Sequence, residues 1–123
     1  AILKGKPIKV FNEGNLSRDF TYIDDIVKGV ENTLLKSSRN KDLYKLYNIG
    51  NSQPVRLLDF IEAIEKCTGK TAERQMLPMQ DGDVNLTWAS VQRLKDDYYY
   101  YPSTSIESGV EAFITWYKSY YNK

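Results

Sequence analysis

Apolar and polar residues alternate in short stretches of the chain, and this alternation predicts three strands. In the first stretch Ile8 and Val10 share one face, while Phe11 lies on the other, as in a strand whose side chains repeat every second residue. The predicted strands are residues 7–12, 45–51 and 72–78, with a shorter extended run at 18–23.

Apolar residues at helical spacing predict four helices. They run from Asp25 to about Lys36, from residues 53–55 to Gly69, from Ser90 to about Asp97, and onward from Thr104. The predicted N-caps are Asp24, Ser90 and Thr104, the last in a capping box with Glu107. The longer helices have apolar faces made of Ile26, Val27, Val30 and Leu34, then Leu57, Leu58, Ile61 and Ile64, then Ile106, Val110, Phe113 and Tyr117.

Strands that alternate with helices predict an α/β fold, and no linker divides residues 1–123, which we interpret as one domain. Three short strands make a thin sheet for four helices, because parallel strands normally carry helices on both faces. The opening residues 1–6 are typical of the last turn of a helix closed by Gly5. We therefore predict a fragment of a longer chain.

Composition excludes several classes of function. The 123 residues are 41% hydrophobic and 27% charged with a net charge of +1, a balance that predicts neither a nucleic-acid nor a membrane partner. The absence of histidine excludes histidine-based triads and the common zinc sites. The single cysteine, Cys67, forms no internal disulfide, and we interpret it as a packed small residue in a cytoplasmic protein.

Two loop segments carry candidate binding residues. Arg18 follows a turn, and its guanidinium presents a planar set of donors that matches phosphate oxygens. From spacing alone, the simpler alternative is a surface arginine paired with a carboxylate such as Asp19. In residues 80–84, Gly82 permits a sharp turn, Asp83 could accept hydrogen bonds from a sugar diol, and Gln80 could donate from its amide. The alternative here is a turn with an Asx hydrogen bond.

The remaining polar and aromatic motifs favour structural interpretations. Asp24 and Asp25 could act as catalytic carboxylates, but a cap and a first-turn acid at a helix N-terminus explain them better. The four tyrosines of residues 98–101 could stack on bases, yet no basic run surrounds them, which favours packing. Residues 50–55 do not form the glycine pattern of a dinucleotide-binding loop. The residues alone thus predict an α/β domain with a possible anion-binding arginine.

Three stretches together resemble one family. Residues 5–30, with "RDFTYIDDIV", residues 47–65, with "YNIGN", and residues 76–90, with "LPMQDGDV" and "TWA", are similar to the C-terminal part of NAD-dependent nucleotide-sugar epimerases and dehydratases. These enzymes belong to the extended short-chain dehydrogenase/reductase family. The third stretch is the narrowest signal, and it resembles the UDP-glucuronate 4-epimerase subgroup.

The resemblance implies a set of substrate-binding residues. Arg18 matches the arginine that holds the diphosphate, and Asp83 matches the acid near the ribose. Val10 and Phe11 match the strand beside the uracil, which acts partly through backbone groups. The remaining matches are Val55, a wall residue beside the nucleotide, and Gln80, an arginine in some relatives. Asn85 and Ser90 depart from the proline and aspartate that are frequent at their positions.

The resemblance also implies what the intact protein does. It would invert C4 of a UDP-sugar, with UDP-glucuronate as the expected substrate, through an NAD-dependent 4-keto intermediate in polysaccharide biosynthesis. NAD, the Tyr-x-x-x-Lys motif and all catalytic residues belong to an N-terminal Rossmann half that this chain lacks, so the chain alone is expected to bind no cofactor and to be inactive. The intact enzyme would be a homodimer, and the chain alone could self-associate through the face that meets the missing half. A 4,6-dehydratase or decarboxylase of the same family, and a stand-alone nucleotide-binding module, remain alternatives.

Overall fold

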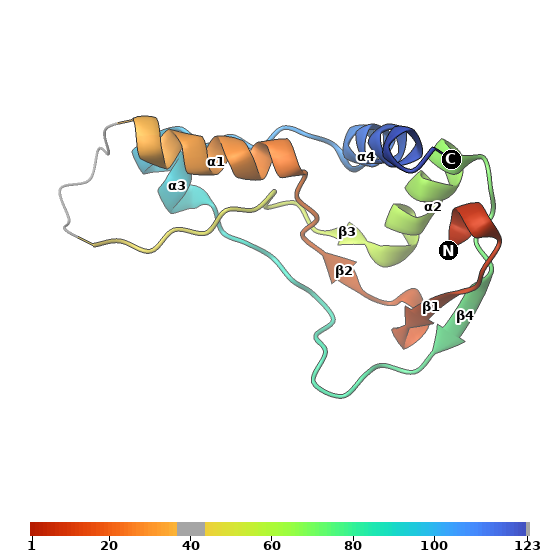
Figure 1. The fold of residues 1–123 in the computed structure, drawn as a ribbon. Coiled ribbons are helices and arrows are strands. Elements are labelled where there is room, and N and C mark those ends of the chain that lie inside the picture. The colour runs from red at the N-terminus through yellow and green to blue at the C-terminus, as the bar shows by residue number, and fades with distance from the viewer. Residues whose placement is uncertain (37–43, 123) are drawn as a thin grey trace. The chain divides into compact units, whose positions relative to one another are not determined.

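The computed structural model describes residues 1–36 and 44–122, which form two compact units. Unit 1 consists of the described residues in 1–18, 55–87 and 105–122, and unit 2 of those in 19–54 and 88–104. Each unit is assembled from segments that are distant in sequence, and neither unit is continuous along the chain. The α/β character that the sequence predicts is confirmed (Figure 1).

Unit 1 contains two short sheets. Strand β1 (Ile8–Phe11) pairs in parallel with β4 (Arg74–Leu77), and β2 (Ser17–Arg18) pairs antiparallel with β3 (Val55–Arg56). Val10 of β1 is fully buried and packs with Ile61 and Ala72, as the alternation of the first strand predicts. A four-residue strand with one buried side chain is held mainly by the helix that packs on it, because so short a ladder is marginal alone.

One long helix packs on this core, and a second long helix packs on the first. Helix α2 (Leu57–Thr68) ends at Gly69, whose φ of 70° lies in the left-handed region that glycine adopts without strain. Helix α4 (Ile106–Tyr120) packs against α2 through Val110 and Ile114. The predicted glycine endings at Gly5 and Gly69 are both confirmed, since Gly5 also caps a short 3₁₀ turn, η1 (Ile2–Lys4), with φ 62°. A second 3₁₀ turn, η2 (Asn12–Gly14), follows β1.

Unit 2 is built on helices α1 (Ile23–Leu35) and α3 (Gln92–Tyr98). Its core contains Leu94 and Tyr100, both essentially without exposure, and the Tyr100 hydroxyl donates to the Gly50 carbonyl at 2.9 Å. Of the four consecutive tyrosines, Tyr100 is a core residue and Tyr98 packs against that core, which confirms the predicted packing for these two rings, whereas Tyr99 and Tyr101 are exposed.

The predicted helix caps are displaced by one or two residues. Helix α1 begins at Ile23, so Asp24 lies in its first turn instead of capping it. The buried carboxylate of Asp25 accepts from Thr104 N at 3.1 Å and, more weakly, from Ser103 N. Helix α3 is preceded by Val91 without a side-chain cap, and α4 is capped by Ser105, whose Oγ accepts from Ser108 N. Ser90 and Thr104 are therefore not caps.

The second predicted strand is wrong. Residues 45–51, all of them described, form no strand, and Tyr47 and Ile49 pack instead against the unit 2 core. A strand needs a hydrogen-bonded neighbour, and none is present among the described residues of this unit. The single three-stranded sheet is accordingly replaced by two two-stranded sheets.

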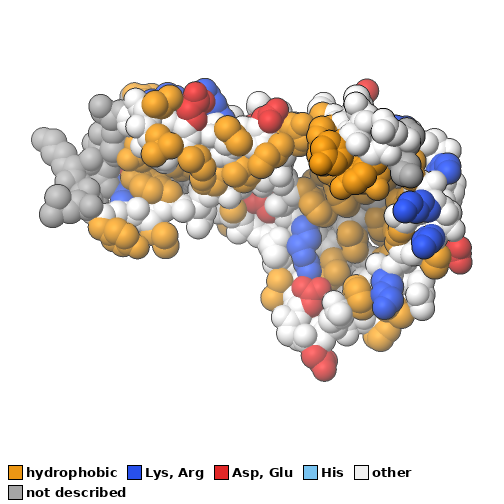
Figure 2. Space-filling model, in the orientation of Figure 1, with side chains coloured by type: hydrophobic (Ala, Val, Ile, Leu, Met, Phe, Trp, Pro, Cys, Tyr) orange, Lys and Arg blue, Asp and Glu red, His pale blue; other side chains and the backbone are white. Residues whose placement is uncertain are grey.

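Two helices present apolar side chains to solvent. On α1 the large apolar residues that are exposed are Ile23, Val27, Val30, Leu34 and Leu35, each between 44% and 77% exposed. Figure 2 shows hydrophobic side chains gathered along this helix. On α4 the predicted core residue Phe113 is 51% exposed, because Ile114 occupies the inward position, and Phe113 continues into Trp116 and Tyr120. Large exposed apolar patches on a folded unit mark surfaces that other protein covers.

Candidate functional site

The candidate site is built around strand β2 in unit 1. Ser17 of β2 lies opposite Arg56 of β3, and Arg18 lies opposite Val55. On the other side of β2, Ser17 N donates to the Asn85 carbonyl at 2.8 Å, and Thr87 N donates to the Ser17 carbonyl at 3.2 Å. The segment that contains Asn85 is thereby fastened to β2. Strand β2 therefore has β3 on one side and the segment of residues 85–87 on the other.

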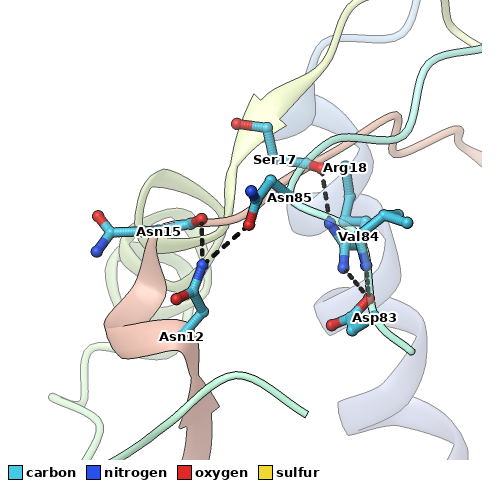
Figure 3. Close-up of polar contacts among 7 residues, drawn as sticks. All are labelled: Asn12, Asn15, Ser17, Arg18, Asp83, Val84 and Asn85. Atoms are coloured by element: carbon cyan, nitrogen blue, oxygen red, sulfur yellow. Dashed lines mark hydrogen bonds and ion pairs between the residues drawn. The ribbon is translucent and has the colours of Figure 1, made fainter. Parts of the chain in front are cut away.

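The Arg18 guanidinium is held at two points (Figure 3). Its Nη1 donates to the Ser17 carbonyl at 2.9 Å, and its Nη2 lies 2.6 Å from Asp83 Oδ1. The two side chains are 23% and 30% exposed, so the pair is partly shielded from water but still accessible. The carboxylate that pairs with Arg18 in this structure is therefore Asp83, 65 residues away, and not the neighbouring Asp19.

Asp83 stands at the end of a tight turn. Asp83 N donates to the Gln80 carbonyl at 3.2 Å, and Gly82 between them has φ 81°. A Cβ added at Gly82 would meet nothing within 4 Å, so glycine is required there by the backbone angle and not by space. Asp83 Oδ1 also accepts from Val84 N at 2.8 Å. The sequence predicts a turn at residues 80–84, and the structure contains it. This turn carries the Asp83 carboxylate that pairs with Arg18.

The structure places all six predicted site residues in unit 1. Val55 is directly opposite Arg18 in the β2–β3 pair, and Gln80 shares the turn of Asp83 with an exposed side chain. Val10 is fully buried, so only its backbone is available to a ligand. Phe11 is half-buried and lies opposite Leu77 at the end of β4, immediately before the loop that leads to Gln80.

Three residues that the sequence analysis does not assign to the site, Asn12, Ser17 and Asn85, connect its segments by hydrogen bonds. Asn12 Nδ2 donates to the Asn15 carbonyl at 3.0 Å and to Asn85 Oδ1 at 3.2 Å, as Figure 3 shows. Ser17 supplies the backbone groups described above. Asn12 has φ 49°, and asparagine tolerates the left-handed region better than most residues. The turn-like composition of residues 12–15 was the available signal, whereas its contact with Asn85 spans 73 positions and has no local signature.

This arrangement suits the binding of an anion. A guanidinium has five N–H donors, of which two are used by Ser17 and Asp83. The remaining N–H groups can donate hydrogen bonds to phosphate oxygens, and a planar guanidinium favours such bidentate contacts. Among the residues that the structure describes, no group of histidine, cysteine, aspartate and glutamate side chains could hold a metal ion. None of the described helices has the length and apolar character needed to cross a bilayer.

Comparison with known proteins gives consistent matches. The model of the NAD dependent epimerase/dehydratase family matches residues 1–50. Protein CapI of Staphylococcus aureus is 43% identical over the whole chain, and a probable UDP-glucuronate 4-epimerase of Rhizobium meliloti is 39% identical over the whole chain. The crystal structure of UDP-glucuronic acid 4-epimerase from Bacillus cereus, in complex with UDP-glucuronic acid and NAD, superposes with a TM-score of 0.86 at 33% identity over 97% of the chain.

These matches support the assignment of the chain as a fragment from the NAD-dependent epimerase/dehydratase family. It spans 41% and 40% of the lengths of the two curated relatives and 37% of the Bacillus cereus structure. The family model covers Val10, Phe11 and Arg18, while the longer matches extend over Val55, Gln80 and Asp83 as well.

Proposed function

We propose that this chain forms the nucleotide-sugar-binding part of a UDP-sugar 4-epimerase, with Arg18 as the residue that holds the diphosphate. The observation that carries the proposal is the position of the Arg18 guanidinium, fixed at the meeting point of β2 and the loop after Gly82. A cation held there by a carboxylate and a carbonyl keeps free donors for a doubly charged ligand.

The other site residues take parts that fit this placement. Asp83, the partner of Arg18, would accept hydrogen bonds from the ribose hydroxyls. Val55, opposite Arg18, would form an apolar wall beside the nucleotide, and Gln80 would donate from the outer end of the turn. For Val10 the contact with the base is limited to the backbone, because its side chain is buried, and Phe11 would extend that surface.

The sugar specificity that we propose is for UDP-glucuronate. The support is the Rhizobium meliloti relative and the Bacillus cereus structure with bound UDP-glucuronic acid. The chain would bind the nucleotide, which is distant from the sugar ring that reacts. The binding energy of the nucleotide would then orient the sugar for reaction at the Rossmann half.

NAD is part of the activity that we propose for the complete protein. The 123 residues contain no glycine-rich dinucleotide-binding loop. NAD would supply hydride transfer at C4 when bound to the N-terminal Rossmann half that we propose for the complete protein. Because the residues of this chain do not fit the cofactor, we propose that the chain alone is inactive.

We propose that the Rossmann half covers the exposed face of α1 in unit 2. This face consists of Ile23, Val27, Val30 and Leu34. The relatives are more than twice as long as the chain, so they contain enough protein to cover it. We also propose a cytoplasmic protein on the basis of its single cysteine, Cys67, and a homodimer for the intact enzyme.

The experiment is a titration of the full-length protein with UDP by calorimetry. Arg18→Ala is expected to weaken binding by on the order of 1.5–3 kcal/mol, the usual size of a charge-assisted contact. Arg56→Ala is the matched control, since Arg56 lies on the paired strand, is largely exposed and forms its own ion pair with Asp59. Equal affinities for the unchanged protein and Arg18→Ala would refute the proposal.

A further inference from the structure

We propose that Asp83 positions the Arg18 guanidinium for a diphosphate, in addition to any contact of its own with the nucleotide. This inference rests on the proposed function of Arg18. It concerns a role that Asp83 performs through another residue, and it predicts an effect on ligands that have no ribose.

Both acceptors of the guanidinium are themselves fixed. The Ser17 carbonyl also accepts from Thr87 N, and Ser17 N is bonded to the Asn85 carbonyl. Asp83 Oδ1 also accepts from Val84 N at 2.8 Å and follows the Gln80–Asp83 turn. Arg18 is therefore held in one rotamer by two anchored oxygens, with Nη1 on one and Nη2 on the other.

Two effects of Asp83 on an incoming diphosphate have opposite signs. Its negative charge repels the ligand, but the pair is 23% and 30% exposed, and charge interactions near water are weak. Its hydrogen bond removes the rotational freedom that Arg18 would otherwise lose on binding, which is worth about two- to tenfold in affinity. Substitutions can separate the two effects, because asparagine removes the charge and keeps the acceptor, whereas alanine removes both.

The experiment measures competition of inorganic pyrophosphate against labelled UDP in the full-length protein. Pyrophosphate has no ribose, so the loss of a ribose contact does not affect it. We expect Asp83→Asn to bind pyrophosphate at least as tightly as the unchanged protein, and Asp83→Ala to bind it about two- to tenfold more weakly than Asp83→Asn. In the Arg18→Ala background this difference between Asn and Ala is expected to disappear.

Each result decides the matter. Equal or tighter binding of pyrophosphate by Asp83→Ala than by Asp83→Asn would overturn positioning, as would a difference that persists without Arg18, or a failure of pyrophosphate to compete in the unchanged protein. If Arg18→Ala weakens UDP binding while the Asn–Ala difference is absent, the proposed function stands and only the positioning role falls. Thermal midpoints confirm folding of each variant, and Asp83→Leu replaces the alanine variant if that one does not fold.

Discussion

The Glu65 carboxylate near the end of α2 lies 2.8 Å from the Arg74 guanidinium at the start of β4, measured from Oε2 to Nη2. Its other oxygen, Oε1, accepts from Ala72 N at 2.7 Å. One side chain thus fixes the connection from the α2 C-terminus to β4, and Ala72 lies in the core cluster beside it. Since β4 leads directly into the loop that carries Asp83, this connection sets where the candidate site begins.

The hydrogen bond from Ala72 N, followed by that from Arg74, lowers the pKa of Glu65 below its ordinary value of 4.5. A lowered pKa in the folded state means that the ionised form stabilises the fold. This stabilisation is fully present above pH 4.5 and is lost as the pH falls further through the folded-state pKa. We expect the thermal midpoint of the protein to exceed that of Glu65→Gln at pH 7, and the difference to shrink towards pH 3. Glu62→Gln, an exposed site on the same helix, is the control and should show no such convergence.

Tyr100 provides a second test, at the other end of the pH scale. Burial raises the pKa of its phenol to about 12, and the hydroxyl donates to the Gly50 carbonyl. We expect Tyr100→Phe to lower the free energy of unfolding by about 1–2 kcal/mol, because a carbonyl loses its donor. Tyr101→Phe, at an exposed ring, should cost under about 0.5 kcal/mol. Chemical denaturation at pH 7 measures both, and equal losses would contradict the role assigned to Tyr100.

The raised pKa of Tyr100 also predicts alkaline sensitivity. The neutral phenol is favoured in the fold, so its contribution is complete below pH 10, the ordinary value, and is lost between pH 10 and about 12. The stability of the protein should therefore fall more steeply in this range than that of Tyr100→Phe. If the stability of the two proteins falls equally with rising pH, ionisation of the Tyr100 phenol is not linked to unfolding.

Gly50 is required by space. A Cβ built there would lie 2.6 Å from the Ala89 Cβ and 3.1 Å from Asp19 Oδ2. Gly50→Ala should therefore destabilise unit 2 by about 1–3 kcal/mol, the usual cost of overpacking. Ala89→Gly removes the closest atom, so the double variant should recover part of the loss, and the two changes should be non-additive. Additive losses in thermal or chemical unfolding would place the strain elsewhere.

The sequence was most informative where structure is determined locally. Gly5 and Gly69 end helical turns because a left-handed backbone angle is a property of the residue itself. The strand expected at residues 45–51 failed because a ladder depends on a neighbour, which no local pattern reports. The N-caps were displaced since neighbouring polar residues compete for the same role, as Thr104 and Ser105 show.

The candidate site followed the same rule. Arg18 and Asp83 could each be nominated, the first from its donors and the second from its turn, and the family resemblance linked both to one ligand. Their direct pairing could not be predicted, because 65 residues separate them and Asp19 was an equally suitable partner by spacing. The contact between Asn12 and Asn85 spans 73 positions, and Asn85 stands where proline is frequent in the family that the sequence resembles.

The exposed face of α1 predicts one effect in the 123-residue chain alone and a different effect in the full-length protein. In the 123-residue chain alone, Ile23, Val27, Val30 and Leu34 meet water, so self-association should bury them. Val27→Ser with Leu34→Ser should then reduce association, as measured by sedimentation velocity. In the full-length protein, where we propose that this face is covered, the same two changes should lower the thermal midpoint, because buried apolar side chains are lost.

Phe113→Ser with Tyr120→Ser on α4 is the matched control, since those residues are equally exposed but belong to unit 1. If the α4 variant and not the α1 variant reduces association, the interface lies on α4; if the α1 variant leaves the full-length protein as stable as before, the Rossmann half does not cover α1.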